Sequence, residues 1–133
     1  MDHLENVDWV TARAGCSAMH VFRKMKEEVR RDVEIRNRLR GDAPTFVFKF
    51  SDEGQSFKVA LEGAKAPASV TFGSNGNRIV AVDQAGNEIA EATPVMSDEA
   101  SCALAMPGHD EPCEDWKFRL KALEHLFFVA PAA

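Results

Sequence analysis

The chain has 133 residues, of which 45% are apolar and 28% are charged, and its net charge is −5 at pH 7. A chain of this size and composition can bury a substantial core, so we expect one globular domain over residues 1–133 and exclude disordered and fibrous classes. No apolar stretch approaches membrane-spanning length, and no basic segment leads into an apolar run at the N-terminus. We therefore expect a cytoplasmic protein without membrane contact.

The segment from Cys16 to Gly41 (CSAMHVFRKMKEEVRRDVEIRNRLRG) has the clearest periodicity in the chain. Apolar residues such as Phe22 and Met25 recur at helical spacing, and charged side chains occupy the opposite side, so the pattern predicts a long amphipathic helix. Ser17 is its expected N-cap, because a serine hydroxyl accepts a free backbone N–H of the first turn. A shorter helix is expected before it, over Asp2–Ala14.

The long helix also carries most of the positive charge. Residues 11–40 contain nine Lys/Arg against four Asp/Glu, whereas the rest of the chain is acidic. We expect most of these cations to be solvated, although the layout would also suit an acidic or phosphate-bearing partner. The basic residues that would meet such a partner are Lys24, Arg30, Arg31, Arg38 and Arg40. Nucleic-acid binding is not expected, because the pI is about 5.4 and no aromatic residues alternate with the basic ones.

Two charged residues, Asp32 and Arg36, interrupt the apolar stripe of the long helix. Their i, i+4 spacing is that of a helical ion pair, which we expect to lie where the stripe leaves the core. The alternative is a buried pair that faces a polar pocket, since buried charges are costly unless they are paired.

After the long helix the apolar period changes from 3.6 to 2, which predicts β-strands. The segment Asp52-Glu53-Gly54-Gln55 has the composition of a tight turn, and two later Gly-containing segments share this property. Short strands joined by such turns form an antiparallel meander. The six expected strands are Thr45–Ser51, Ser56–Glu62, Ser69–Gly73, Arg78–Asp83, Glu88–Thr93 and Ala100–Met106.

Alternation along these strands assigns their side chains to two faces of the sheet. The core face begins with Phe46, Phe48, Phe50, Phe57, Val59 and Leu61. The other face is expected to carry small apolar side chains, which favours close packing of a second layer. That layer would be a second copy of the chain or a partner protein, or else a helix of the same chain acting through Phe118 and Ala122. The small residues assigned to this face are Val47, Ala60, Ala81, Ala90, Ala92, Ala103 and Ala105.

A closing helix is expected from Trp116 to about Phe128, with Asp115 as its N-cap. Its expected buried stripe is Trp116, Leu120, Leu123 and Phe127. Together the elements predict an α+β fold in which an antiparallel meander of up to six strands wraps the long N-terminal helix and the C-terminal helix closes it. Cystatin-like and helix-grip rolls are built in this way.

No motif identifies a catalytic, metal or cofactor site. Cys16 and His20 have the spacing of a nucleophile and its base, and His109 and Cys113 carry ligand-type side chains, but both sets lack the further residues that such sites need. We therefore expect no cofactor and no metal, and an enzyme is the less favoured class. The cysteine count, three with no CxxC spacing, favours reduced thiols over disulfides.

Two kinds of function remain. The first is a non-enzymatic interaction module of unknown role that forms a homodimer, or binds another protein, through the alanine-rich sheet face. The alternative is a small-molecule pocket, for binding or catalysis, between the Phe-rich sheet face and the long helix. The candidate residues of that pocket are Asp32, Arg36, Phe48 and Phe50.

Overall fold

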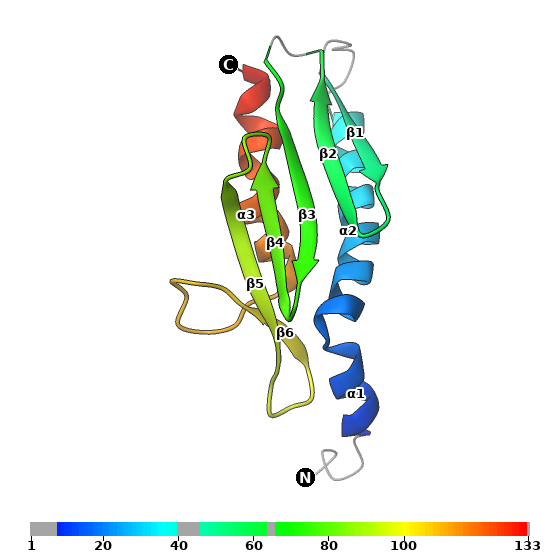
Figure 1. Cartoon of the computed structure of the whole chain (residues 1–133), viewed down its shortest axis with the longest axis vertical. Coiled ribbons are helices and arrows are strands. Elements are labelled where there is room, and N and C mark those ends of the chain that lie inside the picture. The colour runs from blue at the N-terminus through cyan, green and yellow to red at the C-terminus, as the bar shows by residue number, and fades with distance from the viewer. Residues whose placement is uncertain (1–7, 40–45, 64–65, 133) are drawn as a thin grey trace.

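The computed structural model describes residues 8–39, 46–63 and 66–132, which form two layers (Figure 1). The helices in these residues are α1 (Trp9–Gly15), α2 (Ala18–Leu39) and α3 (Asp115–Phe128), followed by the 3-10 turn η2 (Ala130–Ala132). The strands are β1 (Val47–Asp52), β2 (Ser56–Glu62), β3 (Ser69–Asn75), β4 (Arg78–Asp83), β5 (Glu88–Met96) and β6 (Cys102–Ala105).

The strands form one antiparallel sheet in the order β1-β2-β3-β4-β5-β6, and each strand pairs with the next along the chain. The predicted six-stranded meander and the α+β class are therefore confirmed. Both long helices lie behind the same face of the sheet, α2 behind β1 and β2 and α3 behind β3 to β5 (Figure 1). The closer analogy to cystatin-like and helix-grip rolls stays a prediction.

Local chemistry explains where the predicted elements begin and turn. The Ser17 hydroxyl accepts the His20 N–H at 3.3 Å, so Ser17 caps α2 as predicted. In the first hairpin, Asp52 accepts the Gly54 N–H at 3.0 Å, and Gly54 has φ +88°, a conformation that glycine adopts without steric cost. The predicted first helix is present from Trp9, and its expected residues 2–7 lie outside the described residues.

The core lies between the sheet and the two long helices. A chain of aromatic rings crosses it from α2 to α3: the ring centroids of Phe22 and Phe57 are 5.0 Å apart, those of Phe57 and Phe72 4.8 Å, and those of Phe72 and Phe118 6.3 Å. Each ring is buried, and burial of such a side chain contributes on the order of 1.5–3 kcal/mol. This chain of rings holds both helices on one face of the sheet.

The buried face of α3 differs from the prediction. In the predicted stripe, Leu123 and Phe127 are buried, but Trp116 and Leu120 are exposed. The buried face is completed by Phe118, Ala122 and Leu126. The helix has apolar residues on most of its circumference, so periodicity alone does not fix which of its sides faces the sheet. Asp115 is the first residue of α3, and Glu114 occupies the N-cap position.

The cysteine prediction is also wrong. Cys16 and Cys102 form a disulfide across 86 positions of sequence, with their Cα atoms 5.3 Å apart, and Cys113 is a free thiol. The bond joins the junction of α1 and α2 to the first residue of β6. Spacing in the sequence could not reveal this pair, because the fold alone brings the two segments together. The expected cytoplasmic location stays a prediction.

Candidate functional site

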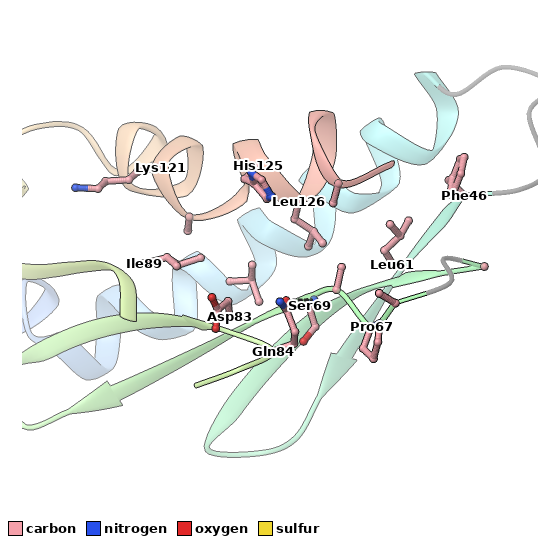
Figure 2. Close-up of a pocket in the computed structure, with 16 residues that line it drawn as sticks. Phe46, Leu61, Pro67, Ser69, Asp83, Gln84, Ile89, Lys121, His125 and Leu126 are labelled. Carbon is pink, nitrogen blue, oxygen red and sulfur yellow. Dashed lines mark hydrogen bonds between the residues drawn. The ribbon is translucent and has the colours of Figure 1, made fainter. Parts of the chain in front are cut away.

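A hollow of about 820 Å³ opens between α3 and the sheet, near the C-terminal end of the helix. In Figure 2, His125 and Leu126 extend from α3 toward the strands, and Lys121 lies at the edge of the hollow with its side chain directed away from them. The strand side includes Phe46, Leu61, Pro67, Ser69, Asp83, Gln84 and Ile89. The hollow is thus shared by four segments that are separate in sequence.

Small side chains leave this space unfilled. The connection from β2 to β3 contributes Gly63, Ala66, Pro67, Ala68 and Ser69 to the wall, and none of these side chains reaches far from the backbone. On α3 the facing position is Ala122, which is buried. Larger residues at these positions would close the gap between helix and sheet, as the aromatic rings do in the middle of the molecule.

Most of the wall is apolar, and the polar groups have defined positions. Lys121 and His125 are four residues apart on α3, so they lie one above the other on the same side of the helix. Across the hollow, the Gln84 side-chain oxygen accepts the Ser69 N–H at 3.1 Å, which leaves the amide NH2 group of Gln84 as the donor at this wall (Figure 2). Apolar pockets with a few placed polar groups are typical of small-molecule sites.

Asp83 has a structural role at the edge of the hollow. Its carboxylate accepts the N–H groups of Asn87 at 3.0 Å and Ala85 at 2.9 Å, and so it holds the turn between β4 and β5. Hydrogen bonding from the Asn87 backbone, with that from Ala85, holds the pKa of Asp83 below its usual value. Asp83 therefore stays ionised, and its Oδ1 atom is held by the turn.

The two charged residues predicted from α2 do not pair with each other. Asp32 accepts a hydrogen bond from Arg119 of α3 at 2.5 Å, and Arg36 donates to the backbone oxygen of Phe127 at 3.0 Å. The predicted i, i+4 ion pair is therefore wrong. Both residues do line a depression, but it is an outer groove of about 270 Å³ between α2 and α3, away from the sheet.

The two aromatic candidates fill the space in which the pocket was predicted. Phe48 packs edge-on against Phe127 with centroids 4.9 Å apart, and the Arg36 guanidinium lies 5.4 Å from the Phe48 ring centroid. Phe50 stacks on Phe57 at 5.6 Å. These rings occupy the interface between the sheet and α2, so the candidate hollow lies about α3 instead.

The six interface candidates separate onto the two faces of the sheet. Ala81 pairs with Phe72 on one side and Ala90 on the other, and cross-strand partners share a face, so these alanines face the core. Ala92 is buried beside them, in one cluster with Phe118 and Ala122 of α3. The placement of Ala81, Ala90 and Ala92 on the outer face was wrong. Ala60, Ala103 and Ala105 are half-exposed.

A cluster of charged residues between α2 and α3 had no counterpart in the sequence analysis. Arg119 donates to Asp115 at 3.0 Å and also to Asp32, and Glu28 lies next to Asp115. Burial and then the neighbouring Asp115 carboxyl raise the pKa of Glu28 to about 7. The spacing of Asp115 and Arg119 was a possible signal for their pairing, but the contacts across the two helices depend on the fold.

The free cysteine, Cys113, is half-buried. The Cys113 thiol donates to the Leu104 backbone oxygen at 3.5 Å and contacts the Met106 sulfur at 3.3 Å. The predicted pair of Cys16 and His20 is not formed, because Cys16 is in the disulfide and the His20 ring bonds the Ser17 hydroxyl at 2.9 Å. Lys121 and His125 of the hollow were missed, although their i, i+4 spacing on a helix was visible.

Within the described residues, no helix combines the length and the apolar character that crossing a membrane requires. Comparison with known proteins gave no match to a family model, to a curated protein or to a solved structure.

Proposed function

We propose that the protein binds a small, mostly apolar molecule with an acidic group in the hollow beside α3. The observation that carries this proposal is a space of about 820 Å³ with an apolar wall and with Lys121 and His125 on one side. Ligand pockets commonly have about 300–1,000 Å³ and a few polar groups that orient the ligand. The alternative sequence-based interpretation, a small-molecule pocket, is thus retained with a different set of residues.

The position of Lys121 sets the expected class of ligand. Its ammonium group offers hydrogen bonds and positive charge, and the Asp83 carboxylate near the opposite wall is held within its own turn. An apolar chain would contact Leu61, Ile89 and Leu126, while a carboxylate at its end would meet Lys121. Medium-chain fatty acids have this combination of an apolar body and an anionic end.

Isothermal titration calorimetry with octanoate and octan-1-ol tests this assignment. Octanoate should bind more tightly than the alcohol, and Lys121→Met should remove that preference and weaken octanoate binding about fivefold, or about 1 kcal/mol for a solvent-accessible ion pair. Lys117→Met is the matched control, because Lys117 is on the same helix and contacts Trp116 outside the hollow. Ile89→Trp should reduce the binding of both ligands by filling the space.

Two results would contradict the proposal: no binding of octanoate to the wild-type chain, or equal binding to the wild type and to the Ile89→Trp variant. Circular dichroism of each variant establishes that the fold is retained. Loss of octanoate affinity in Lys117→Met to the same degree as in Lys121→Met would assign the charge effect to the whole helix surface, and would also contradict the proposed position of the carboxylate.

Self-association through the outer sheet face is a second candidate, and the composition of that face favours it. Val80 and Val82 of β4 are half-exposed there, with Ala60 on β2, and both long helices lie on the opposite side of the sheet (Figure 1). We expect a dimer at high protein concentration that Val80→Lys disrupts, because a buried lysine without a partner is costly. Sedimentation velocity over a concentration series is the measurement, and a wild-type monomer throughout would exclude this candidate.

A further inference from the structure

The outer groove between α2 and α3 is separate from the hollow, and the two are lined by different residues. The two helices run side by side in the same direction there, since Asp32 contacts Arg119 and, further towards the C-terminal end of both helices, Arg36 contacts Phe127. These contacts fix the helices relative to each other. The groove between them measures about 270 Å³ and is open to solvent.

Large apolar side chains line this groove and remain exposed. They come from both helices, and we call them the α2–α3 strip. The exposed fractions are 37% for Ile35, 72% for Leu39, 48% for Trp116, 45% for Leu120 and 61% for Phe128. Single exposed apolar residues are common on protein surfaces, but a contiguous set on two adjacent helices is typical of an interaction site. The exposure of Trp116 also places a preferred anchor residue at this surface.

The charges around the strip are mostly positive, although the chain as a whole carries −5. At 100° per residue, the row next to Ile35 on the solvent side of α2 consists of Lys24, Arg31 and Arg38, and all three are exposed. The row beyond it, further from the groove, holds the exposed Glu27 and Glu34. On the α3 side, the exposed Lys117 and Glu124 balance each other. Inside the groove, Asp32 is paired with Arg119. The rim therefore favours an acidic partner.

The shape of the groove selects among acidic partners. A valley between two fixed parallel helices accepts the side-chain ridge of a third helix, whereas a flat membrane surface touches only its rims. A second copy of this chain would bring two identical basic rows into the same interface, where like charges repel. We infer that the α2–α3 strip is a docking site for an amphipathic helix with acidic flanks from a partner protein.

The experiment uses display-selected helices and the intact oxidised chain. A library of amphipathic helices with one fixed apolar stripe, and with flanking positions drawn from Asp, Glu, Lys, Arg and Ser, is selected on the immobilised protein. Acidic flanks should be enriched, and by fluorescence anisotropy the selected helix should bind about tenfold or more tightly than its Lys-flanked version. Leu120→Ser should weaken this binding about tenfold, because it removes an exposed anchor without touching the core.

Trp9→Ser is the matched control, since Trp9 is 63% exposed on α1, away from the strip, and its loss should leave the affinity unchanged. The double variant Arg31→Ser/Arg38→Ser should lose the preference for acidic flanks while keeping binding to the apolar stripe. Failure to enrich any helix, or enrichment of basic flanks, would overturn the inference. So would Leu120-dependent binding to phosphatidylserine vesicles, which indicates a membrane, or a dimer that Leu120→Ser abolishes, which indicates a second copy.

Discussion

Among single residues, Glu28 is the one whose surroundings most alter its chemistry. It is half-buried on α2, and among the described residues its Oε1 atom is buried without a hydrogen-bond partner. The neighbouring Asp115 carboxyl is itself held by Arg119 at 3.0 Å, and Arg119 also binds Asp32, so three carboxyl groups and one guanidinium lie at the contact between α2 and α3. Burial and Asp115 both favour the protonated form of Glu28, which raises its pKa to about 7.

This shift makes the stability of the fold depend on pH. In the unfolded chain Glu28 titrates near 4.5, so the folded protein holds this proton more firmly and loses stability as the pH rises from about 4.5 through about 7. Glu28→Gln should therefore remove this fall and raise the free energy of unfolding above pH 7, by up to about 1 kcal/mol because water reaches the site. Urea unfolding at a series of pH values is the measurement.

Glu27→Gln is the matched control for this pH dependence. Glu27 is the adjacent position, is exposed and pairs with Arg30 on the surface, so its substitution should leave the slope of stability against pH as in the wild type. An unchanged slope in Glu28→Gln would show that another group is responsible.

At the scale of elements, the outcome of sequence reasoning depended on how one-sided each pattern was. The long helix α2 and the first hairpin have apolar residues on one side only, and their faces could be predicted from spacing. Helix α3 is apolar on most sides, and so its orientation is decided by the sheet, which buries Phe118 and exposes Trp116. The face of the sheet on which the alanines of β4 and β5 lie was ambiguous for a similar reason, since small residues fit beneath a helix as well as on an open face.

Contacts between elements were less predictable than the elements themselves. The Asn37 side chain accepts the Phe48 N–H at 2.9 Å and donates to the Phe48 backbone oxygen at 2.8 Å, so it pairs with the edge strand β1 as another strand would. No local pattern marks an asparagine for this role. The hollow beside α3 has the same origin, because its small wall residues and its Lys121–His125 pair are visible in the sequence but their convergence requires the fold.

At the scale of the whole molecule, the Cys16–Cys102 disulfide ties the helical layer to the last strand of the sheet. It lies where α1 meets α2, towards one end of the long axis, and the hollow lies near the C-terminal end of α3, towards the other (Figure 1). The sheet is a meander in which each strand pairs with its neighbours in sequence, so β1 and β6 form its two opposite edges. Pairing within the sheet therefore does not join the first strand to the last. The disulfide instead joins the start of α2 to β6 covalently.

Removing the bond should therefore destabilise the protein without altering the hollow. Cys102→Ser is the suitable substitution, since Cys102 is exposed and the change itself leaves no cavity, whereas Cys16 is buried. We expect a loss of about 2–4 kcal/mol in the free energy of unfolding, because the bond restricts the unfolded chain over a long loop. Reduction of the wild type should lower its stability to the same level, and Cys113→Ser should retain both the bond and the sensitivity to reductant.

Octanoate affinity of the folded Cys102→Ser variant should equal that of the wild type, since the disulfide and the hollow are at opposite ends of the molecule. A wild-type protein whose urea midpoint is unchanged by reductant would contradict the role assigned to this disulfide.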